Sequence, residues 1–440
     1  MNTWREAKLV NRAKEVLLAN RKNGFTIPTA NLYPFQWNWD SGFISLGYQH
    51  FELDFALEEL ATLFSGQWQN GMIPHILFHS ENEDSYFPNH PFWDSQRNPG
   101  APAQLKTSGI TQPPVHGFVL EQIYQQFPKD NRVAQFIKKY FHHIQRSHQF
   151  FYSSRDPHQE RLAYIYHPWE SGRDNSPLWD QAINRIEIDP AQLPNYQRKD
   201  NLISNLEERP TDRDYDRYVY LLELGKRHNY DHPSIAVQSP FLIQDTLLNA
   251  LLIRSNESLI NLGESFGFEV EELRQWQAKS IANFNAKLWN EQIQFYAPYD
   301  LCSKTCIDIR EIGGLLALFA GIASEEQAQL LHQYLQQLLD EGFFLCPSFD
   351  PAHPLFDSRR YWRGPIWPQM NWLIYRGLQR YGFEDTAAQV RENLLELVSH
   401  LGFYEYFEPK QDLAIMLDKG YGGNHFSWTA AVVLDLILAT

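Results

Sequence analysis

Helical periodicity runs through this chain from one end to the other. In residues 133–144 apolar side chains recur every three or four positions, which places them on one face of a helix. The segment 324–342 begins with Ser324 and Gln327 at capping-box spacing and ends on Gly342. Similar patterns occupy 51–64, 216–228, 240–254, 269–289, 385–401 and 426–438. The chain is therefore predicted to be mostly helical, with one short strand pair at 293–300.

Long loops rich in proline, glycine and tryptophan separate the expected helices. They include "NLYPFQWNWDSGF", "SYFPNHPFWDSQRNPGAPAQLKTSGITQPPV" and "GFYEYFEPKQDLAIMLDKGYGGNHFSW". Loops of this length inside a compact domain are usually functional. No Gly/Ser linker, low-complexity tract or charge block divides the chain. We therefore expect a single domain over residues 1–440, an all-α toroid of helix hairpins whose loops gather at one end around a central pocket.

The charge balance and the cysteine content limit the partners and the compartment. The 38 Lys and Arg residues against 53 Asp and Glu give a net charge of −15, which repels a phosphate backbone, so no nucleic-acid partner is expected. Three cysteines cannot build a disulfide framework, which favours a reducing compartment. The chain shows no signal-peptide apolar run at its start and no 18-residue apolar segment. We expect a cytoplasmic protein without a membrane partner, and a homo-oligomer is left open.

Aromatic residues make up 15% of the chain, with 13 Trp and 22 Tyr among them. Their flat apolar faces and polar edges suit pockets for polar ligands such as sugars, although a large aromatic core is the plainer interpretation. The tryptophans concentrate in the long loops rather than on the helix faces. This distribution favours a ligand pocket built from the loops.

The stretch 167–180, "HPWESGRDNSPLWD", places acids among tryptophans. The acids are Glu170, Asp174 and Asp180, and the tryptophans are Trp169 and Trp179. Loss of water beside large apolar rings raises a carboxyl pKa, which keeps an acid protonated near neutral pH. Asp174 is therefore a candidate proton donor. A local alternative is that Asn175 or Ser176 caps a helix whose first position is Pro177, and both interpretations can hold at once.

A second carboxylate for acid–base chemistry has to come from a distant loop. The segment "GFYEYFEP" supplies Glu405 and Glu408, and Glu405 lies between two tyrosines whose hydroxyls could orient it. The alternative is a solvated loop acid, which is what most glutamates are. Because 231 residues separate Asp174 from Glu405, spacing alone cannot show that they meet.

A third acid, Asp40, follows two tryptophans in "FQWNWDSG". In an extended segment Trp37 and Trp39 would share one face and Asp40 would take the other. A sugar site uses this combination, with a ring for stacking and a carboxylate that accepts hydrogen bonds from hydroxyls. The alternative is that Asp40 caps a helix that starts near Gly42.

Metal-ligand patterns in the chain are weak. His75 and His79 are four residues apart, but the Glu of the zinc motif HExxH and a third ligand are missing. Cys302 and Cys306 have only one other cysteine in the chain to join them, which makes a zinc site improbable. We expect neither a metal nor an organic cofactor in the chemistry.

Five motifs together resemble a known family. They are "LYPFQWNWDSGF", "GITQPPV", "HPWESGRDNSPLW", "RRYWRGPIWP" and "FYEYFEP" followed by "GGNHFSWTAAV". In this order they are similar to the mannosylglycerate/glucosylglycerate hydrolases of glycoside hydrolase family 63, from about residue 25 to the C-terminus. The resemblance implies an (α/α)6 barrel and hydrolysis with inversion of the anomeric configuration.

The resemblance also implies roles for individual residues. Asp174 matches the general acid and Glu405 the general base, whereas Glu408 stands where the family pattern has Asp. The residues implied for the sugar pocket are Tyr33, Trp37, Asp40 and Gln112, with Trp169, Tyr361, Trp362 and Trp367 around them. Arg209 and Tyr215 match the segment that grips the glycerate carboxylate. Without the resemblance, a surface ion pair of Arg209 with Glu207 or Glu208 is the plainer interpretation.

The combined hypothesis is an inverting, exo-acting α-glycosidase for a small-molecule glycoside. The substrate that the resemblance implies is 2-O-α-D-glucosylglycerate or mannosylglycerate, which would be cleaved to the sugar and D-glycerate. The alternatives are a hydrolase of another small α-glucoside such as a disaccharide, a non-catalytic sugar-binding toroid, and an isomerase or epimerase on a similar toroid.

Overall fold

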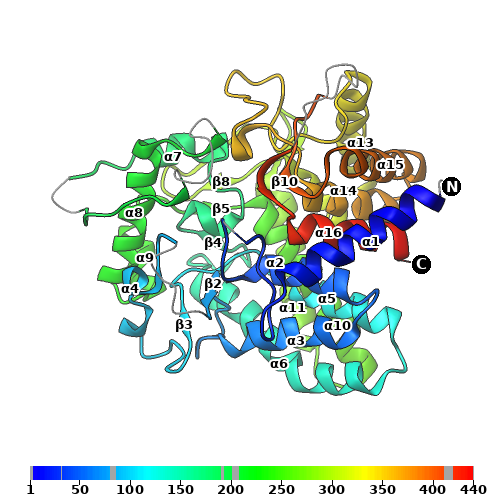
Figure 1. The fold of residues 1–440 in the computed structure, drawn as a ribbon. Helices are drawn as coiled ribbons and strands as arrows, with labels where there is room; N and C mark the ends of the chain where they lie inside the picture. Colours follow the sequence, from blue (N-terminus) through cyan, green and yellow to red (C-terminus); the bar gives the residue numbers. More distant parts are fainter. Residues whose placement is uncertain are drawn as a thin grey trace.

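The computed structural model describes residues 3–30, 32–79, 86–189, 193–200, 208–410 and 420–439. Helices dominate these residues, which confirms the mostly helical prediction (Figure 1). The α-helices are α1 (Thr3–Asn20), α2 (Asn38–Tyr48), α3 (Leu53–Ser65), α4 (His90–Trp93), α5 (His116–Gln126), α6 (Asn131–Ser154), α7 (Asp180–Asn184), α8 (Asp212–Arg227), α9 (His232–Gln238), α10 (Thr246–Phe266), α11 (Glu271–Leu288), α12 (Leu316–Ala320), α13 (Glu325–Asp340), α14 (Pro368–Arg380), α15 (Glu384–Leu401) and α16 (Ser427–Leu438). Short 3-10 helices near the site are η3 (Pro168–Ser171), η4 (Pro177–Trp179) and η9 (Tyr361–Arg363).

Six of the helices contact one another in a closed series. The order is α2, α5, α10, α12, α14, α16 and back to α2. Helices such as α2 and α16 are buried almost all round, as expected for helices without a polar stripe. A second set packs against this series: α1 on α16, α3 on α2, α6 on α10, α11 on α10 and α15 on α14. Figure 1 shows α1 and α16 side by side, with the two chain ends near each other.

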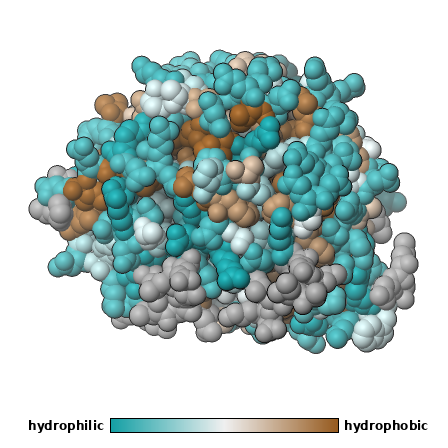
Figure 2. Space-filling view, turned by 90° about the horizontal axis from the view of Figure 1, so that it is seen from above, coloured by the Kyte–Doolittle hydropathy of each residue, from teal (hydrophilic) through white to brown (hydrophobic). Residues whose placement is uncertain are grey.

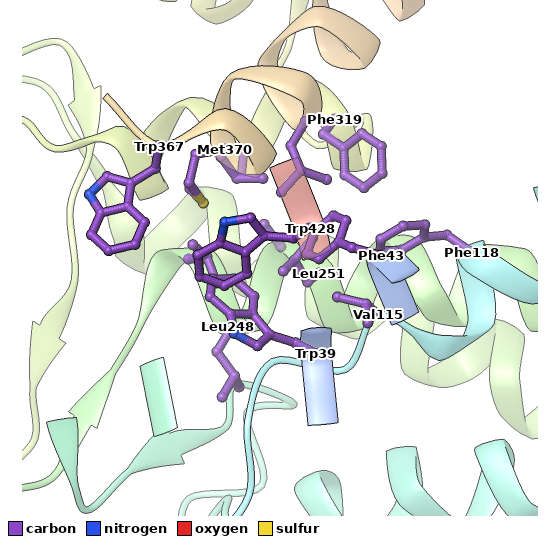
Figure 3. Packing of buried hydrophobic residues seen from close by; sticks show 14 of the residues in the cluster. Trp39, Phe43, Val115, Phe118, Leu248, Leu251, Phe319, Trp367, Met370 and Trp428 are labelled. Carbon is purple, nitrogen blue, oxygen red and sulfur yellow. The ribbon is translucent and has the colours of Figure 1, made fainter. Parts of the chain in front are cut away.

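Large aromatic side chains fill the space between the helices of the closed series. The indole of Trp39 in α2 meets Trp428 of α16 edge to face at 5.7 Å between ring centroids. Phe43, one turn after Trp39, packs against Trp372 of α14 at 6.0 Å. Figure 3 shows Trp39, Phe43 and Trp428 together in this core. Full burial of such a ring stabilises the fold by about 1.5–3 kcal/mol, so the aromatic residues serve the core as well as the loops.

Within the described residues, the strands are two to four residues long and form four small antiparallel sheets. They are β1 (Gln36–Trp37), β2 (Ile76–Phe78), β3 (Lys106–Thr107), β4 (Tyr164–Ile165), β5 (Ile243–Gln244), β6 (Trp289–Asn290), β7 (Phe295–Tyr296), β8 (Tyr299–Asp300), β9 (Thr305–Cys306), β10 (Tyr404–Tyr406) and β11 (Tyr421–Asn424). A strand pair was expected only near 293–300, where β7 pairs with β6 and β8 lies in another sheet. The other strands escaped prediction because two to four residues are too few for a clear alternating pattern.

The small sheets tie the long loops to the helices. Trp37 of β1 pairs with Ile76 of β2, and Tyr406 of β10 pairs with Tyr421 of β11.

The face shown in Figure 2 is largely hydrophilic and carries hydrophobic residues only in small patches. Among the described residues, no helix combines the length and the apolar character that crossing a bilayer requires.

Candidate active site

One cavity, with about 860 Å³ of empty space including its opening to solvent, lies among the long loops. Its wall brings together eleven of the twelve residues singled out from the sequence, although they come from segments spread from residue 33 to residue 405. These eleven are Tyr33, Trp37, Asp40, Gln112, Trp169, Asp174, Arg209, Tyr215, Tyr361, Trp362 and Glu405.

The twelfth residue, Trp367, lies behind the wall. Its fully buried indole stacks on Trp362 with 3.7 Å between ring centroids and 5° between planes. Its Nε1 donates to the main-chain carbonyl of Tyr361 at 3.2 Å. Trp367 therefore supports two wall residues and has no surface in the cavity itself.

Asp174 lies in a tight turn at the start of η4. The main-chain N–H of Ser176 donates to the carbonyl of Arg173 at 3.1 Å, which closes a four-residue turn with Asp174 in its second position. Ser176 then caps η4 by accepting from the N–H of Leu178, as the local interpretation of this stretch predicted. The cap leaves the Asp174 side chain free to face the cavity.

Gly172 explains how this turn approaches the core so closely. Its φ of +70° is a conformation that glycine adopts without strain. A Cβ at this position would come within 2.6 Å of the Trp39 indole. The turn at residues 173–176, called the acid turn below, therefore lies directly against the aromatic core of the closed helix series.

The other two acids of this stretch are held by arginines from elsewhere. Glu170 forms a fully buried ion pair with Arg155, and Asp180 forms a two-pronged pair with Arg363. Asp174 has no such partner in the part of the chain that the structure describes, and it is only partly buried at the cavity wall. Burial raises its pKa to about 7, against a smaller lowering by Arg209 and a further raising by Glu405.

Glu405, in β10, is surrounded by donors. Tyr33 and Tyr361 donate their hydroxyls to its Oε1 at 3.0 and 3.4 Å, and the N–H of Gly423 donates to its Oε2 at 3.0 Å. Burial raises the pKa of Glu405, while Arg209 and these three donors act in the opposite direction by favouring the anion. Gly422, at φ +68°, is required beside it because a Cβ there would lie 2.2 Å from Oε2.

Asp40 lies within the first turn of α2 and is not its cap. The N-cap position belongs to Trp37, without a side-chain hydrogen bond, so the capping alternative is wrong. The expected alternation is wrong too, because the helix begins at Asn38 and places Trp37, Trp39 and Asp40 in the wall of the same cavity. Burial raises the pKa of Asp40 well above its usual value, and the nearby Glu405 raises it further.

Arg209 is the buried cation of the site. Its guanidinium lies 4.4 Å from the centre of the Tyr361 ring, donates to the Tyr33 hydroxyl at 3.2 Å and pairs with Asp200 at 3.3 Å. The side chain is buried at the cavity wall, so the surface location of the alternative interpretation is wrong. Of the acids named for that pair, Glu207 lies outside the described residues. The hydroxyl of Tyr215 donates to the carbonyl of Phe87 at 3.2 Å, which leaves its ring to face the cavity.

The two histidines of "HILFH" lie in different surroundings. His75 contributes to the cavity wall, and burial lowers its pKa to about 3. His79 hydrogen-bonds Gln36 at 2.7 Å, and burial lowers its pKa to about 4. Among the described residues, no cluster of three or more His, Cys, Asp or Glu side chains is arranged to hold a metal ion.

Comparison with known proteins shows which family the chain belongs to. The family model of the mannosylglycerate hydrolase MGH1-like glycoside hydrolase domain matches residues 33–429. The chain belongs to this family. It is therefore a glycoside hydrolase, as the motifs predicted.

Curated relatives match along nearly the whole chain. The mannosylglycerate hydrolase of Thermus thermophilus is 40% identical over 96% of this chain and 99% of its own length. That of Rubrobacter radiotolerans is 38% identical over 98% and 97%. The glucosylglycerate hydrolase of Mycolicibacterium hassiacum is 32% identical over 97% of both chains.

Solved structures agree with the sequence relatives. The crystal structure of the family 63 mannosylglycerate hydrolase from Thermus thermophilus with Tris and D-glycerate superimposes with a TM-score of 0.90, at 39% identity over 97% of this chain and 99% of that one. The complex of the same enzyme with glucose gives a TM-score of 0.87 at 40% identity, with the same coverage of both chains.

The cavity of this glycoside hydrolase also includes residues that sequence reasoning missed. They are Pro28, Leu32, Tyr86, Phe87, Gly172, Lys199, Asp200, Pro210, Phe426 and Trp428, whereas Trp39 and His75, which also line the cavity, were already named from the sequence. Most of them belong to the long loops or the motif segments, so the loops themselves were the available signal.

Proposed function

We propose that this glycoside hydrolase cleaves 2-O-α-glycosides of D-glycerate, with glucose or mannose as the sugar, and inverts the anomeric configuration. The observation that carries the proposal is that Asp174 and Glu405 share one cavity in opposite surroundings. A carboxyl with a pKa of about 7 and no side-chain donor among the described residues suits an acid, and a carboxyl that accepts three hydrogen bonds suits a base.

The chemistry follows from these two states. Asp174 gives its proton to the glycosidic oxygen as the bond to the anomeric carbon breaks. Glu405 takes a proton from a water that attacks the same carbon from the opposite face, so that the sugar leaves with inverted configuration. Asp40, Gln112 and the aromatic wall would hold the sugar ring between the two carboxyl groups.

The aglycone side of the proposal depends on charge. A protein with a net charge of −15 needs a local cation to bind an anionic substrate, and Arg209 and Lys199 both reach the cavity. A guanidinium offers two parallel donors to a carboxylate. The names of the relatives, and the D-glycerate bound in one relative's crystal structure, support glycerate as this anion.

We also infer that the closed series of six helices is the inner ring of an (α/α)6 barrel that forms a single domain over residues 1–440. The second set of helices, each packed on a member of the series, supports an outer ring. The continuity of the buried hydrophobic cluster, from Leu9 to Leu436, supports one domain.

The test is hydrolysis of a panel of α-glucosides and α-mannosides, with the anomer of the released sugar followed by NMR. We expect the β-anomer first, and turnover of glycerate conjugates well above that of neutral disaccharides. A preferred disaccharide would select the alternative hydrolase, and rearranged sugar without a released aglycone would indicate an isomerase. Binding without turnover would overturn the proposal in favour of a sugar-binding toroid.

An Arg209→Ala variant tests the aglycone separately. We expect the Michaelis constant to rise by about 100-fold for glycerate conjugates and by much less for an uncharged α-glucoside, because a buried charge-assisted hydrogen-bond pair is lost only in the first case. Equal effects on both substrates would exclude carboxylate recognition by Arg209.

A further inference from the structure

Three consecutive main-chain carbonyls of the acid turn accept hydrogen bonds from side chains of three different elements. Trp179 of η4 donates its Nε1 to the carbonyl of Arg173 at 2.7 Å. Tyr218 of α8 donates its hydroxyl to the carbonyl of Asp174, also at 2.7 Å. Arg363 of η9 donates Nη1 to the carbonyl of Asn175 at 3.3 Å. The backbone on both sides of Asp174 is thus attached to the surrounding helices.

The Asp174 carboxyl group itself accepts no hydrogen bond from a side chain of the described residues, in contrast with the three main-chain carbonyls. A donor to the carboxyl group would stabilise the anion and make the group a weaker proton donor. A donor to the main-chain carbonyl places the same side chain without contacting the atoms that ionise. The arrangement therefore fixes the position of the Asp174 side chain without stabilising its charged form.

We propose that Tyr218 is a positioning residue of the reaction, which holds Asp174 against the glycosidic oxygen through the main-chain carbonyl without donating to the carboxyl group. The inference depends on the role of Asp174 proposed above. Tyr218 is almost fully buried and is not part of the cavity wall, so it acts through Asp174 and not on the substrate.

The position of Tyr218 in α8 connects the acid with the aglycone side. Helix α8 is capped by Thr211, two residues after Arg209, and carries Tyr215 in the cavity wall one turn before Tyr218. Helix α8 therefore carries a residue of the cavity wall, Tyr215, and also holds the turn around Asp174 through Tyr218. A change in the position of α8 would move both together.

The experiment compares Tyr218→Phe with the unaltered enzyme on two substrates. With the glycerate glycoside we expect kcat to fall about tenfold with the Michaelis constant within about twofold, because a displaced acid loses part of its contribution to proton transfer. With the α-fluoride of the same sugar, whose leaving group needs little protonation, we expect both constants within about twofold of the unaltered enzyme. The basic limb of the pH profile should stay at the same pH, because no donor to the carboxyl group is removed.

Tyr166→Phe is the matched control. Tyr166 is as buried as Tyr218, but its hydroxyl has no hydrogen-bond partner among the described residues, so its removal should leave all these constants unchanged. Trp179→Phe removes a second donor to the acid turn and should reproduce the dependence on the leaving group. Thermal unfolding of each variant separates a displaced turn from a poorly folded protein.

The outcomes distinguish this inference from the proposed function. If Asp174→Asn loses activity mainly on the glycerate glycoside and Tyr218→Phe loses none, the positioning role is wrong while the acid assignment stands. Equal losses on both substrates for Tyr218→Phe would also overturn it, since that pattern indicates a general distortion. If Asp174→Asn itself shows no dependence on the leaving group, the proposed function fails first.

Discussion

Asp174 and Glu405 lie in the wall of the same cavity, yet the protein holds them by different atoms. The turn around Asp174 is attached through three main-chain carbonyls, and no side chain of the described residues donates to its carboxyl group. Glu405 lies in a two-stranded sheet, and its carboxylate oxygens accept hydrogen bonds from two tyrosine hydroxyls and one main-chain N–H. Burial raises the pKa of both groups, and of the two only Glu405 receives hydrogen bonds from side chains of the described residues that oppose it.

This difference shows how one cavity can hold a protonated and an ionised carboxyl group. Donors aimed at a carboxyl favour its anion, so a base can be positioned directly by its hydrogen bonds. An acid that has to keep its proton is better positioned through its backbone. The contrast predicts that removing either carboxyl group, or a donor to one of them, has different effects on activity, pH dependence and stability.

The largest expected effect is that of Glu405→Gln. Loss of the base should lower kcat by about 1,000-fold or more on both the glycerate glycoside and the α-glycosyl fluoride, because water must be activated whatever group leaves. Steady-state kinetics on the two substrates measures this. A loss confined to the poor leaving group would mean that the roles of the two acids are exchanged.

Asp174→Asn should be the next largest in effect. We expect kcat on the glycerate glycoside to fall by about 100-fold or more, with a much smaller loss on the fluoride. The basic limb of kcat/KM, expected near pH 7 in the unaltered enzyme, should disappear because the group that must stay protonated is gone. Near-normal turnover of the glycerate glycoside would contradict the assignment.

A smaller effect is expected from Tyr33→Phe, which removes one donor to Glu405. The pKa of Glu405 should rise, so the acidic limb of kcat/KM should move to higher pH, and activity on that limb should fall about tenfold. Tyr406→Phe is the control, because Tyr406 adjoins Glu405 in β10 and its hydroxyl has no hydrogen-bond partner among the described residues. An acidic limb that shifts equally in both variants would show that Tyr33 has no special part.

The smallest effect concerns stability. The pKa of Asp174 is about 7 in the folded protein against 3.8 for a free carboxyl, so the folded state binds the proton more tightly and the free energy of unfolding falls as pH rises from about 4 to about 7. Asp174→Asn removes this penalty. It should therefore increase the free energy of unfolding by at least about 1 kcal/mol at pH 8 and by less at pH 4.5. A variant less stable than the unaltered enzyme at pH 8 would contradict the burial of an uncompensated acid.

Some local features of the fold could be predicted from the sequence. The capping box at Ser324 and Gln327 and the cap at Ser176 were predicted correctly, because a cap joins residues two or three positions apart. The position of Asp40 was not, because the start of α2 at Asn38 depends on packing in the core and changes the direction of each following side chain. Local patterns are reliable only where local contacts decide the conformation.

The three acids of "HPWESGRDNSPLWD" also show where prediction from the sequence ends. All three lie among the same tryptophans in the sequence, and Asp174 was the predicted proton donor. Arg155 and Arg363 neutralise Glu170 and Asp180, and Asp174 is left to face the cavity. The family motifs selected Asp174 by resemblance, but the physical reason is visible only when the distant arginines are in place.

The sequence by itself determined several of the long helices, the caps at Ser176 and Ser324, the aromatic loops and the family, because periodicity and motif spacing depend on residues that are close together in the chain. Only the tertiary structure decided which carboxyl groups share a cavity, which have partners and which lose water. Desolvation and charge act through space, and the groups that set them for Asp174 and Glu405 come from segments far apart along the chain.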